Sequence, residues 1–289
     1  MKNPSHTLGE LLDCMSRNFQ EHAMEQAHAE AVAIIAELLD CNRVQAEFDR
    51  SRVLAQEVFE RGLDIMQRRL RNEPWQYIFE RAYFRDLTLR VTPDVLIPRP
   101  ETELLAEWCI LFTPQHGSLL DVGTGSGAIA LSVAGERCDV KVTACDVSKA
   151  ALQIAQSNQP PDAVNKVEFL ESDLLSSFSG RKFDVIAANL PYVTETEHAE
   201  LSPEVRDFEP KLALTADNDG LALICKLIEQ APQFLNNRGA IILEMSDWQT
   251  SLAADYLSDQ LCWSAIEIKR DYTQRNRFVV ARLREQLIF

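Results

Sequence analysis

The chain has 289 residues, of which 46% are hydrophobic, and a formal net charge of −15. The length allows one large domain or one large and one small domain, and the apolar fraction excludes a disordered chain. The acidic balance disfavours a surface that follows nucleic-acid phosphates, because such a surface needs clustered Lys and Arg. It fits a protein whose partner is a basic protein or a ribonucleoprotein.

The seven cysteines lie at irregular spacings, and no two of them form a Cys-x-x-Cys pair. An odd number of this kind predicts reduced thiols and no disulfide framework, and the histidines show no helical pair that predicts a metal site. The sequence lacks a cationic stretch followed by an apolar block at its start, and lacks an apolar run of about 18 residues. We therefore expect a cytoplasmic protein with neither a metal nor a membrane partner.

Residues 1–80 are predicted to form a small helical bundle. Apolar side chains recur there at helical spacing in three stretches, at 8–19, 31–39 and 53–70. Most of these positions are explained by packing within the bundle. A separate helical domain before a larger one also predicts a role in recognising the substrate or partner.

Residues 81–97 are predicted to form a β-hairpin that links two domains. Apolar and polar residues alternate at 87–91, as in a strand with one buried face, and Pro93-Asp94 supplies a turn. The next block, 97–103, reads Ile-Pro-Arg-Pro-Glu-Thr-Glu. Its two prolines cannot lie inside a helix, so we expect a stiff loop that leads into a helix beginning near Thr102.

Residues 98–289 are predicted to form a Rossmann-like α/β domain with a mostly parallel sheet of seven strands. Short apolar runs alternate there with helical stretches, which is typical of a sheet with helices on both faces. The predicted strands cover residues 118–122, 140–145, 166–170, 183–189, 238–245, 263–269 and 277–283. The predicted helices cover residues 127–135, 148–157, 219–234 and 248–259. Ligands of such sheets bind at the carboxyl ends of the strands.

A glycine-rich turn follows the first of these strands, with the sequence Asp121-Val-Gly-Thr-Gly-Ser-Gly127. Glycine permits backbone angles that other residues avoid, and it lets a ligand lie against the main chain. The helix after the turn directs its free N–H groups at a phosphate or a carboxylate. Gly123, Gly125 and Ala128 also satisfy the dinucleotide pattern Gly-x-Gly-x-x-Gly/Ala, so the turn alone does not separate NAD from S-adenosylmethionine.

Acidic residues at three successive strand ends favour S-adenosylmethionine. Asp146 is placed to accept hydrogen bonds from ribose hydroxyls in either cofactor class. Asp121 is placed to engage the amino group of the cofactor, and Asp173 to meet the amino group of adenine. The alternative is a plain tight turn with surface acids. The residues predicted to bind S-adenosylmethionine are Asp121, Gly123, Thr124, Gly125, Ser126, Gly127, Asp146, Asp173, Leu174 and Asn189.

The strand predicted at 183–189 ends in Asn189-Leu190-Pro191-Tyr192. A planar amide or exocyclic amine is a poor nucleophile, and an enzyme can help by accepting hydrogen bonds from both N–H groups and aiming the nitrogen at a methyl group. We expect the Asn189 side-chain oxygen and the Leu190 carbonyl to accept these bonds. Pro191 fixes the chain direction, and Tyr192 packs against the planar group. The alternative is an ordinary loop turn.

The chain resembles the HemK/PrmC family of release-factor glutamine methyltransferases over nearly its whole length. The motifs that carry the resemblance lie at 73–78, 96–103, 121–130, 189–192, 209–210, 213–214, 219–221, 270–272 and Arg277. The block at 97–103 is the most specific, whereas the glycine turn and Asn-x-Pro-Tyr are shared with many amine methyltransferases. The resemblance implies methylation of the glutamine in the Gly-Gly-Gln loop of peptide chain release factors, which act in translation termination. The products would be N5-methylglutamine and S-adenosylhomocysteine.

The resemblance also implies roles for individual residues. Residues 123–127 and Asp146 would hold the cofactor, and residues 189–192 would hold the glutamine amide. Arg99 and Glu101 would shape the mouth of the site. The alternative for Arg99 and Glu101 is an internal ion pair that braces the loop.

Three positions depart from the family pattern. Leu190 stands where the family usually has proline, which keeps the backbone carbonyl but removes a rigid ring. Leu174 stands in place of an aromatic residue beside the adenine, which weakens stacking. Phe79 stands where glycine is common, and this changes the local backbone turn near the domain junction.

Two other functions remain open from the residues alone. A nucleic-acid exocyclic-amine methyltransferase would use the same Asn-x-Pro-Tyr chemistry, but it must extrude a base and bind phosphates. Residues 1–80 hold 9 basic and 14 acidic residues, which disfavours this function. A non-catalytic adaptor that binds S-adenosylmethionine has no need for Asn189 and Tyr192. An NAD-dependent dehydrogenase would lack an evident acid–base pair.

Overall fold

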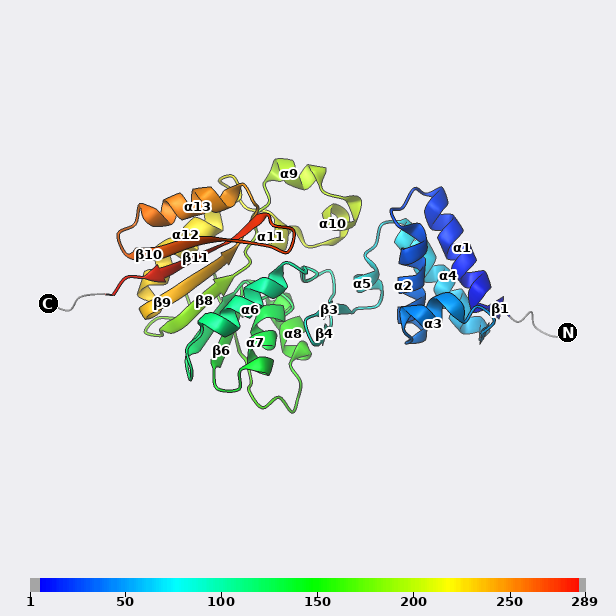
Figure 1. Cartoon of the computed structure of the whole chain (residues 1–289), viewed down its shortest axis with the longest axis horizontal. Helices are drawn as coiled ribbons and strands as arrows, with labels where there is room; N and C mark the ends of the chain where they lie inside the picture. Colours follow the sequence, from blue (N-terminus) through cyan, green and yellow to red (C-terminus); the bar gives the residue numbers. More distant parts are fainter. Residues whose placement is uncertain (1–5, 286–289) are drawn as a thin grey trace. The chain divides into compact units, whose positions relative to one another are not determined.

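A computed structural model describes residues 6–285 of the chain (Figure 1). The chain folds into two compact units, Met1–Glu80 and Arg81–Phe289. Each unit has a hydrophobic core of its own. We describe the two units separately.

The first unit is helical, which confirms the prediction of a small helical bundle. Its helices are α1 (Leu8–Glu21), α2 (Ala27–Leu39), α3 (Arg43–Phe48), α4 (Gln56–Leu70) and α5 (Trp75–Ile78). Thr7 begins α1 with a capping box, in which its side chain accepts from the Glu10 backbone and the Glu10 side chain accepts from the Thr7 backbone. The structure adds two short paired strands that the sequence did not indicate, β1 (His6–Thr7) and β2 (Val53–Leu54).

A β-hairpin opens the second unit, formed by β3 (Ala82–Phe84) and β4 (Leu87–Leu89). The turn predicted at Pro93-Asp94 is present, but it does not join the two strands of the hairpin. The strands are joined at Arg85 and Asp86, where Arg85 has a φ of 50° and its N–H donates to the Glu103 side chain at 3.0 Å. Pro93 and Asp94 lie in a later turn, in which the Val95 N–H donates to the Thr92 carbonyl.

The second unit holds the predicted seven-stranded sheet (Figure 1). Its order is β10 (Trp263–Arg270), β11 (Asn276–Leu283), β9 (Leu235–Glu244), β8 (Phe183–Ala188), β5 (Ser118–Val122), β6 (Lys141–Asp146) and β7 (Glu168–Glu171). The five strands from β9 to β7 are parallel, and β11 runs antiparallel to both of its neighbours. The mostly parallel sheet is therefore confirmed, and each strand lies within three residues of its predicted start.

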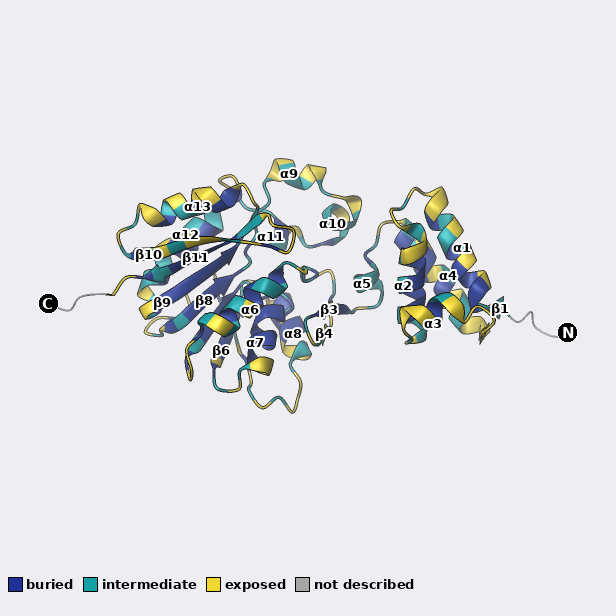
Figure 2. Ribbon diagram, viewed as in Figure 1, coloured by how far each residue is buried: buried dark blue, intermediate teal, exposed yellow. Residues whose placement is uncertain are grey.

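Helices cover both faces of this sheet. α6 (Thr102–Phe112) and α7 (Ala128–Glu136) pack on one face, and α12 (Ala222–Gln230) and α13 (Gln249–Ser258) pack on the other. Buried residues are concentrated in the central strands between these layers (Figure 2). Near-continuous apolar runs are typical of parallel strands that are buried on both faces.

The remaining helices lie in the connections between the strands. α8 (Lys149–Asn158) connects β6 to β7, and the segment between β8 and α12 forms α9 (Glu195–Glu200), α10 (Pro203–Phe208) and α11 (Lys211–Leu214), with a short 3-10 helix, η1 (Ala231–Gln233), after α12. Within residues 6–285, no helix is both long enough and apolar enough to cross a membrane.

Candidate active site

The predicted motifs meet at the carboxyl edge of the sheet because the central strands end in register. Val122 of β5 pairs with Ala188 of β8 on one side and with Cys145 of β6 on the other. The glycine turn, Asn189 and Asp146 therefore leave the sheet side by side. After β5 the chain adds β6 and β7 on one side of it and then β8 on the other. Open α/β sheets bind ligands in the crevice at such a switch point.

The glycine turn lies against the main chain of β6. The N–H groups of Gly123 and Thr124 both donate to the Cys145 carbonyl, at 2.9 and 3.0 Å. Gly125 has a φ of 54°, and a Cβ placed on it would meet no atom within 4 Å. Because Gly125 lines the cavity described below, a side chain there would fill space that is now open to a ligand.

Asp146 is anchored by backbone N–H groups at the end of β6. Its Oδ2 accepts from Gly125 and its Oδ1 from Ser148, each at 2.9 Å. Burial raises the pKa of Asp146, and the N–H groups of Ser148 and Gly125 oppose that rise. The carboxylate is thus held in one orientation at the cavity wall, with lone pairs left for hydroxyl donors.

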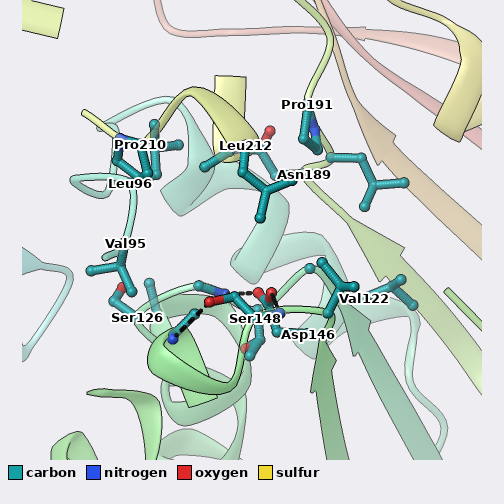
Figure 3. A pocket seen from close by; sticks show the side chains of 18 of the residues that line it. Val95, Leu96, Val122, Ser126, Asp146, Ser148, Asn189, Pro191, Pro210 and Leu212 are labelled. Carbon is teal, nitrogen blue, oxygen red and sulfur yellow. Dashed lines mark hydrogen bonds between the residues drawn. The ribbon is translucent and has the colours of Figure 1, made fainter. Parts of the chain in front are cut away.

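A cavity of about 490 Å³ lies between the strand ends and the loop before α6. Its volume falls in the range of small-molecule sites. Figure 3 shows Asn189, Pro191 and Leu212 on one side of this cavity, facing Ser126, Asp146 and Ser148 on the other. Of the predicted site residues, those that line it are Arg99, Gly123, Thr124, Gly125, Ser126, Asp146, Asp173, Leu174, Asn189, Leu190 and Pro191.

Asp173 and Leu174 lie at the β7 end of this cavity. Both oxygens of Asp173 accept from the Lys226 ammonium, at 3.1 and 3.2 Å. Leu174 is buried and has a φ of 48°. The apolar wall that Leu174 provides suits a flat ring, and the exposed Asp173–Lys226 pair can open to admit a polar group.

A second cavity, of about 450 Å³, opens on the other side of Asn189. Tyr192 lines this cavity and not the first one, together with Val193, Leu214 and Ser246. Burial raises the pKa of Tyr192 to about 12, so its ring keeps the neutral hydroxyl. Leu96, Arg99, Asn189 and Ala213 line both cavities, so Asn189 lies where the two cavities adjoin.

The sequence comparisons place the chain in a family. A release factor glutamine methyltransferase of Lactococcus lactis is 40% identical to the chain over 75% of it and 80% of the relative. One of Thermodesulfovibrio yellowstonii is 32% identical over 87% and 91%, respectively. The chain belongs to the release factor glutamine methyltransferase family. Family models agree, since residues 10–79 match the PrmC N-terminal domain and residues 101–204 the methyltransferase small domain.

Solved structures share the fold of this family member. A methyltransferase from Pyrococcus furiosus is 18% identical, with a TM-score of 0.53 over 77% of the chain and 98% of that structure. The Thermus thermophilus 16S rRNA N2 G1207 methyltransferase, solved with AdoMet and guanosine, is also 18% identical, with a TM-score of 0.52 over 71% and 50%. The chain thus has the Rossmann-like fold that was predicted.

Three predicted residues lie outside both cavities of this glutamine methyltransferase family member. Gly127 caps the amino end of α7 with a φ of 84°, and a Cβ on it would lie 3.2 Å from the Ala155 Cβ of α8, so glycine lets the turn pack closely against α8. Asp121 is fully buried and accepts from the Thr124 hydroxyl at 2.6 Å, which braces the turn from behind. Of the residues described, Glu101 lines neither cavity.

The structure pairs Arg99 with Glu209, and not with Glu101 as the alternative interpretation had it. The Arg99 guanidinium lies 2.5 Å from the Glu209 carboxylate, whose other oxygen accepts from the Ile97 N–H at 3.3 Å. Burial raises the pKa of Glu209, and Arg99 opposes this. The pair ties the Ile97–Pro100 loop to the segment before α11, and it leaves Arg99 at the mouth of both cavities.

Sequence reasoning missed Glu244, which lies directly behind Asn189. Asn189 Nδ2 donates to the Thr102 hydroxyl at 3.2 Å, and that hydroxyl donates to Glu244 Oε1 at 3.1 Å. Glu244 is 2% exposed, and burial raises its pKa to about 7. An acidic residue at the end of an otherwise apolar strand, 238–245, was the signal that could have found it.

The titration of Asp121 predicts a pH-dependent stability. Burial raises the pKa of Asp121 to about 7, against its hydrogen bond from Thr124, so folding favours the protonated carboxyl. Wild-type stability should therefore be lost as the pH rises from about 4, the unfolded pKa, to about 7, by at most about 4 kcal/mol. Asp121→Asn removes this loss. We expect its free energy of unfolding, relative to wild type, to be higher at pH 8 than at pH 5; equal differences at the two pH values would contradict the assignment.

Proposed function

We propose that this chain transfers a methyl group from S-adenosylmethionine to the side-chain amide nitrogen of a glutamine, in the Gly-Gly-Gln motif of peptide chain release factors. One observation carries the proposal: Asn189 lines two cavities, one walled by the glycine turn and Asp146 and one walled by Tyr192. Transfer of a group between two bound molecules needs binding sites that adjoin, because the donor and acceptor atoms must meet.

The first cavity fits the cofactor on its chemistry. The open space over Gly125 admits a ligand next to the main chain, and the amino end of α7 suits the cofactor's carboxylate. Asp146 would hold the ribose hydroxyls, and Leu174 would pack on the adenine beside Asp173. The T. thermophilus neighbour of the same fold is described with AdoMet. When bound, S-adenosylmethionine supplies an electrophilic methyl group on a sulfonium.

The second cavity would receive the glutamine side chain. Its Nε2 would lie against Asn189 where the two cavities adjoin, with one N–H donated to Asn189 Oδ1 and the other to the carbonyl of Leu190, which lines the first cavity. The Tyr192 ring would pack on the planar amide. Methyl transfer to this nitrogen would break the sulfur–carbon bond and leave S-adenosylhomocysteine, and the nitrogen, then cationic, would lose a proton to solvent.

Buried contacts hold the Asn189–Tyr192 segment in place without a proline at position 190. The Leu190 side chain is 5% exposed and packs in the core beneath the sheet edge. Gln249 Nε2 donates to the Tyr192 carbonyl at 2.8 Å, and the Val193 N–H donates to Leu214 at 2.9 Å. Such contacts can replace the stiffness that a proline ring would supply, which leaves the Leu190 carbonyl available to the substrate.

Incubating the purified chain with S-adenosylmethionine and a release factor tests the function. We expect a mass increase of one methyl group on the glutamine of the Gly-Gly-Gln peptide, located by peptide mass spectrometry. A release factor with that glutamine replaced by asparagine is the matched control. Methyl transfer only to RNA or DNA would replace the proposal with an exocyclic-amine methyltransferase, and binding of S-adenosylmethionine without any transfer would indicate an adaptor.

A further inference from the structure

We propose that Thr102 and Glu244 are positioning residues, which turn the Asn189 amide so that its oxygen, and not its NH₂ group, faces the nitrogen to be methylated. This inference rests on the proposed function and goes beyond the residues that would touch the substrate. It explains why a buried acid lies behind the segment that would bind the glutamine.

The hydrogen bonds have a direction that the chemistry of the groups enforces. A hydroxyl carries one hydrogen, and an ionised carboxylate carries none. The Thr102 hydrogen therefore goes to Glu244 Oε1, at 3.1 Å, so that Thr102 can only accept from Asn189, at 3.2 Å. The Thr102 oxygen can therefore accept only from the NH₂ group of the Asn189 amide. Asn189 Oδ1 is then left for the cavities that Asn189 lines.

An asparagine amide without this constraint would present either face. If its NH₂ group faced the substrate, two N–H donors would oppose each other and the nitrogen would be neither activated nor aimed. The constraint comes from three separate parts of the second unit, since Thr102 begins α6, Glu244 ends β9 and Asn189 follows β8. The position of each group is set by packing between α6 and the sheet.

The surroundings of Glu244 show that its carboxylate is costly to bury. In the part of the chain that the structure describes, Glu244 Oε2 and Arg277 Nε are both buried without a hydrogen-bond partner. An unsatisfied buried carboxylate oxygen destabilises a fold, and a glutamine or an apolar residue would avoid that cost. Buried ionisable groups of this kind, next to a cavity, are typical of functional sites.

Three charged groups act on the Glu244 carboxyl. Arg277 of β11 and Arg99 of the loop before α6 favour its ionised form, whereas Glu101 and burial oppose it. Tyr192 adds a neutral hydroxyl nearby. The balance raises the pKa of Glu244 to about 7. A protonated Glu244 can itself donate to Thr102, and the direction of the hydrogen bonds is then no longer fixed.

Isosteric variants at Thr102 provide the first test. Thr102→Val removes the hydroxyl at nearly constant volume, and Thr102→Ser keeps it. We expect kcat for a release factor to fall about 10- to 100-fold in Thr102→Val, with S-adenosylhomocysteine affinity unchanged, and to stay near wild type in Thr102→Ser. Equal kcat in Thr102→Val and wild type would overturn the inference, as would equal losses in both variants.

The pH dependence of kcat provides the second test, because it would not change if Glu244 had only a structural role. Wild-type kcat should rise between pH 6 and pH 8 as Glu244 ionises. Glu244→Gln should have a lower kcat at pH 8 and lose this rise, because a glutamine amide can donate or accept at any pH. A Glu244→Gln profile that rises as the wild-type profile does would contradict the proposal.

A spectroscopic measurement separates this inference from the proposed function. In protein labelled with [¹⁵N]asparagine, the side-chain NH₂ signal of Asn189 is identified by its absence in Asn189→Ala. We expect the signal to shift in Thr102→Val and to keep its position in Thr102→Ser. A signal unmoved in Thr102→Val would refute the hydrogen bond even if wild type methylates a release factor. Conversely, a shift of the Asn189 signal in Thr102→Val would support the hydrogen bond even if wild type methylated no release factor.

Discussion

Asn189→Ala is expected to lower methyl transfer to a release factor by about 10³-fold while leaving the affinity for S-adenosylmethionine nearly unchanged. The variant removes the acceptor that would polarise the substrate amide, and it also removes the N–H donor to the Thr102 hydroxyl. The cofactor cavity keeps its glycine turn and Asp146. Single-turnover rates and calorimetric titration of the cofactor measure the two quantities.

Asn236→Ala is the matched control for this prediction. Asn236 donates to Asp184 at 2.8 Å and lies near the start of β9, at the opposite edge of the sheet from the site. Its loss should lower stability by about 1 kcal/mol without changing the rate in the folded protein. If Asn189→Ala turned over at the wild-type rate, the assignment of the acceptor would be wrong.

The sheet could be predicted from the sequence because its strands are buried on both faces. Strands such as β8 and β9 carry long apolar runs, which predict a parallel sheet and fix where each strand ends. Once the ends are known, the parallel arrangement brings Gly123, Asp146 and Asn189 to one edge. The site could therefore be predicted from a glycine turn, an acid and an amide, each at the end of one strand.

Contacts that depend on packing between distant segments could not be predicted in the same way. Thr102 and Glu244 are 142 residues apart, and Arg99 and Glu209 are 110 apart. Spacing along the chain carries no information about such pairs. The turn at Arg85 and Asp86 that joins the hairpin strands was not predicted, because Arg85 adopts a φ of 50°, a conformation that arginine seldom takes.

Gly220→Ala is expected to cost about 3 kcal/mol of stability or more and to lower kcat with it. Gly220 has a φ of 76°, and a Cβ on it would lie 2.0 Å from the Tyr192 carbonyl oxygen and 2.4 Å from Gln249 Nε2. The same Gln249 nitrogen bonds the Tyr192 and Asp219 carbonyls, each at 2.8 Å. Alanine therefore adds backbone strain and breaks buried hydrogen bonds. Chemical denaturation measures the loss.

Gly135→Ala is the matched control, because Gly135 lies in α7 and a Cβ on it would meet no atom within 4 Å. Alanine favours a helix over glycine by up to about 1 kcal/mol, so this variant should be slightly more stable than wild type and equally active. The rate of Gly220→Ala, measured where it is still folded, then decides how the Tyr192 segment works. A normal rate would mean that the segment tolerates displacement, whereas a reduced rate with intact cofactor binding would mean that its backbone positions the substrate.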